Sequence, residues 1–264
     1  MSDLNVVNPL LAALKIPGRI FPLPSAGLFY KNGELSSDVV NGEIQVHPMS
    51  GLAEMKFRSP DLLYSGKAVS EVIKECVPSI LKPEKIISRD VDSILSFIRI
   101  VTYGPSVEIK STHNCEKAKE HSYFIDVEKI VNETVQLTKE KYEMLFNIKL
   151  SNGQSLQLTP LSWEDAVAVM QFSSMSNIDN DDIDKLYATN IAGMIASIDG
   201  VVDRELIYEW AKVALAPMNK QIQKSVEEGL QGWGPNFETN VTCKDCNSTY
   251  SIPIDLNPAS FFSL

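Results

Sequence analysis

The chain has 264 residues, of which 44% are hydrophobic and 22% are charged, an ordinary balance for a globular protein with a substantial core. Its formal net charge is −10, which argues against general nucleic-acid binding because such binding relies on Lys and Arg. No apolar run approaches the roughly 18 residues that a membrane-spanning helix needs, and the N-terminal residues lack the features of a signal peptide. We therefore expect a cytoplasmic protein without a membrane or nucleic-acid partner.

Residues 1–19 are expected to form an arm with one short helix. Asn8 is a typical helix cap, Pro9 suits the first helical position, and the helix would run to Leu14. A short apolar helix of this kind either docks onto a partner or covers the protein's own core, and the sequence favours neither.

Residues 20–145 are predicted to form a β-rich domain that also contains helices. Strand-like alternation runs from Glu43 to His47, after a segment rich in turn residues. Ser59 then opens a helical region, and a second helix follows Asp90, both with apolar residues at helical spacing.

Residues 146–232 are predicted to hold a β-hairpin followed by a helical block. Asn152 and Gly153 form a strong two-residue turn signal between two alternating segments. Ser162 begins a helix with a capping box, and a later helix is expected to run as far as Ile198.

Two distant stretches, residues 107–130 and 237–256, look like worn copies of one Cys/His module. Each enters a Cys-bearing loop from a strand-like lead and leaves it on a second strand that ends in Ile-Asp. Scarce metal-ligand residue types concentrate in both loops, so we expect residues 233–264 to fold back onto the middle of the chain. The predicted class is α+β, with a β-rich N-terminal part, a helical block and a C-terminal zinc-ribbon-like knuckle.

A structural zinc ion is the favoured occupant of these loops. Cys243 and Cys246 form a C-x-x-C, whose spacing lets both thiolates reach one ion from a tight turn. Cys115 and His121 complete a four-ligand set, with His113 an alternative to either. Two other interpretations stay open: a decayed ribbon with buried, metal-free thiols, and redox chemistry of the C-x-x-C.

The sequence offers no catalytic constellation. It has no G-x-S-x-G, P-loop, G-x-G-x-x-G or H-E-x-x-H motif. His47 precedes a proline on a predicted strand, and the helical spacing around Cys76 predicts a core residue. We therefore predict a protein that is not an enzyme. The rival classes are a zinc-ribbon nucleic-acid adaptor, which the charge disfavours, and a metal-dependent hydrolase using a carboxylate such as Asp245 or Glu116.

One ordered set of segments indicates a particular family and not only a fold class. Its members, in chain order, are Pro24–Tyr30, Gly42–Gly51, Ser59–Ala68, Arg89–Asp90, Tyr103–Pro105 and Asn257–Phe262. In order and spacing, this set resembles the baseplate hub assembly proteins of T-even-like contractile-tailed bacteriophages.

The resemblance implies a late viral protein in the cytoplasm of the infected cell, which helps to build the central hub of the tail baseplate. It would act by contact with hub proteins and not by catalysis. The alternative is a structural hub subunit that stays in the virion. Contacts with partners are expected from Pro24–Tyr30, from the N-terminal helix, and from Phe261 and Phe262 as exposed apolar residues.

Overall fold

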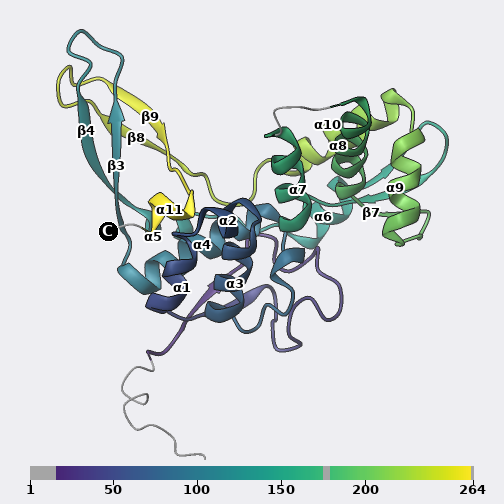
Figure 1. The fold of residues 1–264 in the computed structure, drawn as a ribbon, viewed down its shortest axis with the longest axis horizontal. Coiled ribbons are helices and arrows are strands. Elements are labelled where there is room, and N and C mark those ends of the chain that lie inside the picture. Colours follow the sequence, from purple (N-terminus) through teal and green to yellow (C-terminus); the bar gives the residue numbers. More distant parts are fainter. Residues whose placement is uncertain (1–15, 175–178, 263–264) are drawn as a thin grey trace, which may run out of the picture.

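The computed structural model describes residues 16–174 and 179–262, and these form short helices together with small antiparallel sheets (Figure 1). The predicted α+β class is confirmed. The helix expected at Asn8–Leu14 lies outside the described residues. Within the described ranges, no helix has both the length and the apolar character needed to cross a bilayer.

An N-terminal body is built around one long buried helix. Its elements are β1 (Arg19–Pro22), β2 (Glu43–Val46), α1 (Gly51–Lys56), α2 (Pro60–Tyr64), α3 (Lys67–Cys76), the 3-10 helix η2 (Pro83–Lys85) and α4 (Ser88–Tyr103). The apolar stripe of α4 is buried at Ile94 and Ile98. Strand β1 pairs with β2, and Phe21 on β1 stacks on Phe97 of α4 with ring centroids 4.5 Å apart. The helix therefore supports the small sheet directly.

Both Cys/His stretches form β-hairpins, and the two hairpins project side by side from this body (Figure 1). The first consists of β3 (Ser106–Thr112) and β4 (Glu120–Asp126), and α5 (Val127–Asn132) follows it. The second consists of β8 (Glu238–Thr242) and β9 (Thr249–Pro253), and α11 (Pro258–Phe261) follows it. The expected return of the C-terminal segment to the middle of the chain is thus present in the structure.

The expected exposure of Phe261 and Phe262 is wrong. They are only 3% and 2% exposed, and Phe262 stacks on Phe57 at 4.9 Å between ring centroids. Arg99 of α4 fixes this end of the chain, since its Nε donates to the Phe261 carbonyl at 3.2 Å. These two rings therefore close the N-terminal core and are not free for a partner.

The middle of the chain forms a second body. Its elements are α6 (Lys139–Leu145), β5 (Asn147–Lys149), β6 (Ser155–Leu158), α7 (Trp163–Ser173), α8 (Asn180–Gly193), β7 (Ile195–Ile198), α9 (Arg204–Val213) and α10 (Ala216–Gly229). The predicted Asn-Gly hairpin is confirmed as β5 paired with β6. The Ser162 cap of α7 is confirmed as well, because its side chain accepts from the Asp165 N–H.

The helix expected to reach Ile198 is wrong at its end. Helix α8 stops at Gly193, and Ile195–Ile198 is a strand that pairs with β6. Two isoleucines three residues apart fit one face of a helix, but in this segment a free strand edge of the hairpin is available. Pairing with that edge decides the conformation, and β-branched residues suit it.

Two buried apolar clusters organise the chain. One joins the N-terminal body to both hairpins and α11, and the other lies in the second body around Phe146 and Trp233. Phe29 reaches the second cluster, with ring centroids 4.8 Å from Phe146 and 6.1 Å from Trp233. The division into segments 1–19, 20–145, 146–232 and 233–264 stays a prediction.

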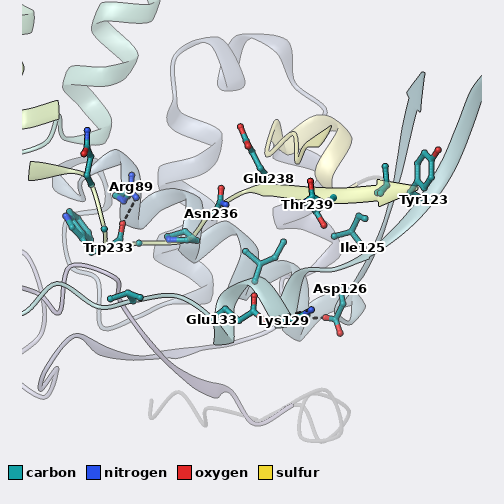
Figure 2. A pocket seen from close by; sticks show the side chains of 18 of the residues that line it. Arg89, Tyr123, Ile125, Asp126, Lys129, Glu133, Trp233, Asn236, Glu238 and Thr239 are labelled. Carbon is teal, nitrogen blue, oxygen red and sulfur yellow. Dashed lines mark hydrogen bonds and ion pairs between the residues drawn. The ribbon is translucent and has the colours of Figure 1, made fainter. Parts of the chain in front are cut away.

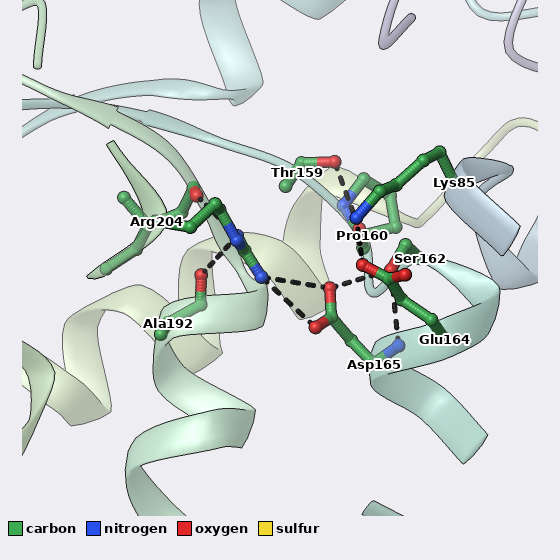
Figure 3. Close-up of polar contacts among 9 residues, drawn as sticks. Lys85, Thr159, Pro160, Ser162, Glu164, Asp165, Ala192 and Arg204 are labelled. Carbon is green, nitrogen blue, oxygen red and sulfur yellow. Dashed lines mark hydrogen bonds and ion pairs between the residues drawn. The ribbon is translucent and has the colours of Figure 1, made fainter. Parts of the chain in front are cut away.

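Polar contacts on α7 connect these two bodies (Figure 3). Glu164 accepts a hydrogen bond from Lys85 of η2, in the N-terminal body. Asp165 accepts from Arg204 of α9, with 3.1 Å between Arg204 Nη2 and each carboxylate oxygen. Arg204 also donates through Nη1 to the Ala192 carbonyl at 3.0 Å, so one guanidinium joins α7, α8 and α9.

Candidate metal centre

The tips of the two hairpins carry the candidate ligands. His113 and Cys115 lie in the loop after β3, where the Cys115 N–H donates to the His113 carbonyl at 2.9 Å. Cys243 follows β8 directly, and the Asn247 N–H donates back to its carbonyl at 3.0 Å. Asn247 has φ of +59°, a left-handed conformation that Asn tolerates and that closes a tight loop. This loop brings the sulfurs of Cys243 and Cys246 within 4.8 Å of each other.

The structure brings His113, Cys115, Cys243 and Cys246 together. Their ligand atoms all lie within 4.8 Å of one another. Two sulfurs that bind one tetrahedral zinc ion at about 2.3 Å are about 3.8 Å apart. The group could therefore hold a metal ion after small side-chain adjustments. Within the group, Cys246 Sγ lies 3.3 Å from His113 Nδ1.

His121, placed in the ligand set from the sequence, lies elsewhere. Its Nε2 is 2.7 Å from Asp245 Oδ2, and both side chains are largely buried. His121 belongs to β4, where it pairs across the hairpin with Ser111. His113 belongs to the loop itself, two residues before Cys115. The two histidines differ in position: His113 lies within the loop, and His121 lies in strand β4. The sequence alone left His113 as an alternative.

Other groups fix this arrangement. The His113 ring stacks on Tyr250 of β9 with centroids 4.5 Å apart. Lys244, between the two cysteines of the C-x-x-C, donates to the Ser122 carbonyl of β4 at 2.8 Å. Together with the His121–Asp245 contact, these interactions hold the hairpins together from both sides of the cluster.

The cysteines differ in burial and in acidity. Cys243 is buried and Cys246 is exposed. Hydrogen bonds from Ser248, through side chain and main chain, lower the pKa of Cys246 to about 6. The pKa of Cys243 is raised: main-chain hydrogen bonds at Cys246 and Asp245 lower it, but burial and the neighbouring thiols outweigh them. A thiolate, the form that binds zinc, is thus already favoured at Cys246.

The donor set indicates a structural centre. Two thiols of one C-x-x-C, a third thiol and an imidazole make a Cys3His set, which is typical of closed structural zinc sites. Asp245 is one of the carboxylates named for the hydrolase alternative. It is hydrogen-bonded to His121, and this hydrogen bond lowers the pKa of the Asp245 carboxyl. The fourth cysteine, Cys76, is a core residue as predicted, and burial raises its pKa to about 12.

Comparison with known proteins identifies the family. Residues 57–225, more than half of the chain, match the family of the T4 bacteriophage base plate protein. The chain belongs to this base plate family. No curated protein and no solved structure matches it.

Membership in the base plate family confirms the coarser part of the resemblance seen in the sequence. A role in the phage baseplate, as a structural component or in its assembly, is supported, and so is contact with other baseplate proteins. The family indicates a structural protein and not an enzyme. The matched region contains His113 and Cys115 but ends before Cys243 and Cys246. The group of candidate ligands therefore joins the matched region to the segment that follows it.

Proposed function

We propose that the chain is an assembly factor of the baseplate hub that acts through protein contacts during tail morphogenesis. Membership in the base plate family is the observation that carries this proposal. The finer assignment to the hub rests on the ordered segments from Pro24–Tyr30 to Asn257–Phe262. In this function the molecule is a scaffold whose surfaces meet hub proteins in the cytoplasm of the infected cell.

The second candidate is a structural subunit that stays in the virion, which the family description favours because it names the base plate itself. Affinity purification from infected cells, compared with the protein content of purified particles, separates the two. An assembly factor is recovered with hub proteins and is missing from particles, whereas a subunit is present in both. A chain that never associates with a hub protein in either preparation contradicts both candidates.

We also propose that one zinc ion bound by His113, Cys115, Cys243 and Cys246 braces the two hairpins. The distances among their ligand atoms support this set over the set with His121. Metal analysis should find one zinc ion per chain. Cys243→Ser should lose the ion and lower the melting temperature, because metal binding contributes folding free energy.

Cys76→Ala is the matched control for this experiment. Cys76 is buried in the N-terminal core and lies outside the cluster. This variant should lower the melting temperature by cavity formation and keep its zinc. Metal-free wild-type protein, or a Cys243→Ser variant that retains zinc, contradicts the brace.

A further inference from the structure

A groove runs along the edge of β8 that faces away from β9. It has a volume of about 970 Å³, and one of its walls is β8 with residues 230–236, the hinge that precedes it. The opposite wall consists of the end of β4, α5 and the residues after α5. Figure 2 shows Glu238 and Thr239 of β8 on one side and Asp126, Lys129 and Glu133 on the other.

Strand β8 presents unpaired main-chain groups on this edge. In an antiparallel pair, residues alternate between those that exchange hydrogen bonds with the partner strand and those that face away. Cys243 donates to Ser248 at 2.9 Å, and Ile254 donates to Phe237 at 2.8 Å, so the odd-numbered residues of β8 face β9.

The N–H and C=O groups of Glu238, Asn240 and Thr242 consequently face away from β9. The described part of the chain supplies no hydrogen-bond partner for them. Such a row of alternate donors and acceptors is complementary to one kind of ligand, another extended strand.

The position of this edge favours one kind of partner strand, a single extended segment, over a hairpin of a second copy. The edge lines one wall of the groove and faces the end of β4 and α5 on the other wall. A folded second copy of the chain would have to bring a whole β-hairpin into this groove to pair its own β8. A single extended segment can enter. Strand β8 has five residues, and a strand rises by about 3.3 Å per residue, so the edge accommodates about five residues.

The side chains of the groove define the chemistry of this segment. Phe124 and Val135 on the wall opposite β8 are 74% and 54% exposed, which favours apolar residues against them. Arg89 lies at the hinge end, beside Trp233 (Figure 2). Its Nη2 donates to the Trp233 carbonyl, but its buried Nε has no acceptor among the described residues. Arg89 is thus held at this end by Trp233, and Asp92 and Asp90 are the acidic groups that act on its guanidinium.

We propose that this groove binds an extended segment of another baseplate protein, which adds as a strand to the free edge of β8. The segment carries apolar residues that meet Phe124 and Val135. The family membership supplies the kind of partner, whereas the strand addition does not depend on the assignment to the hub.

Amide hydrogen exchange on the full-length protein tests the proposal. The probes are overlapping synthetic peptides that cover the other baseplate proteins of the same phage. One peptide should bind and slow exchange at Glu238, Asn240 and Thr242 by at least about tenfold, while Thr239 and Val241 are protected beforehand. Replacing by Asp an apolar residue of that peptide that meets Phe124 or Val135 should weaken binding.

Asn240→Pro provides the matching variant, with Asn240→Ala as its control. The proline removes an outward N–H and leaves the pairing with β9 intact, as prolines on edge strands do. It should weaken peptide binding at least about tenfold, and the alanine variant should bind normally. If the proline variant unfolds, peptides methylated at alternate amide nitrogens replace it, and only one of the two alternations should abolish binding.

Several outcomes overturn the proposal. They are the absence of any binding peptide, binding without protection of the three edge amides, and protection of those amides in the free protein. The last result would mean that the chain itself or a second copy occupies the edge. Association with hub proteins without edge protection would leave the proposed function standing and remove the strand addition.

Discussion

Asp90 is a fully buried carboxylate at the start of α4, and it holds the segment after β1 in place. It accepts hydrogen bonds from the Ser25 N–H at 3.1 Å, from the Ser25 hydroxyl, and from the Tyr30 hydroxyl at 2.5 Å. Burial raises the pKa of Asp90 to about 6, and the hydrogen bonds from Ser25 and Tyr30 offset only part of that effect. The group is therefore a strong constraint on the loop, at a cost in electrostatic free energy.

This pKa predicts a pH dependence of stability. Between the ordinary pKa of 3.8 and the folded value of about 6, the folded state binds the Asp90 proton more tightly than the unfolded state. The contribution is therefore complete below pH 4 and is lost as the pH rises to about 6. Asp90→Asn cannot ionise, so the free energy of unfolding of wild type relative to this variant should fall by about 3 kcal/mol across that range. Urea titrations at several pH values measure it, and a constant difference contradicts the assignment.

The two histidines of the first hairpin should behave differently. His113→Ala should lose zinc affinity because the imidazole belongs to the ligand cluster, whereas His121→Ala should retain the ion because its partner is Asp245. Zinc content after dialysis against a weak chelator measures both variants in parallel. Loss of zinc only in His121→Ala would restore the ligand set expected from the sequence.

At the scale of elements, the turn before β2 approaches the preceding segment closely. Gly42 has φ of +74°, and its carbonyl accepts from the Leu23 N–H at 2.8 Å. A Cβ at this position would lie 2.8 Å from the carbonyl carbon of Ala26 and 2.9 Å from its Cα, which are main-chain atoms. Only glycine allows the two segments to lie this close.

Gly42→Ala should therefore lower the free energy of unfolding by about 2–4 kcal/mol, which combines backbone strain with the clash. Gly33→Ala is the matched control: Gly33 also has positive φ, +84°, but a Cβ there meets nothing within 4 Å. The control should cost only about 1 kcal/mol. Denaturant titration of both variants measures the difference, and equal costs would mean that strain alone operates at Gly42.

Local signals in the sequence predicted several elements well. The turn at Asn152 and Gly153 and the cap at Ser162 depend on neighbouring residues only, and both are as expected. The strand at Ile195–Ile198 depends on a hairpin edge forty residues earlier in the chain, and periodicity carries no information about it. The choice between His113 and His121 likewise depends on where the loop ends, which is set by the pairing of the strands.

At the scale of the whole molecule, the candidate ligand group cross-links two hairpins that both belong to the N-terminal body. Both hairpins pack on the core of the N-terminal body, through Val107 and Tyr123 from the first and Val241 and Ile252 from the second. Helices α8 to α10 surround the other core, around Phe146 and Trp233. A local loss of structure at the hairpin tips should therefore not spread to the core around Phe146 and Trp233.

Removal of the metal tests this separation. A strong chelator should speed amide exchange in the hairpins, residues 106–126 and 238–253, and leave α8 to α10 unchanged, since only the hairpins lose a cross-link. Zinc added back should restore protection. Faster exchange in α8 to α10 as well would show that the two cores unfold as one unit.

The separation of the ligands along the chain also orders events during synthesis. His113 and Cys115 leave the ribosome well before Cys243 and Cys246, and two ligands alone do not close a four-ligand site. Arg99 likewise has no Phe261 carbonyl to bind until the last helix emerges. In the proposed site, a nascent or truncated chain that contains residues 57–225 but not Cys243 and Cys246 would lack two of the four ligands. If the proposed zinc ion binds, a zinc-loaded molecule is one whose translation has passed Cys246, and the ion would distinguish it from shorter fragments.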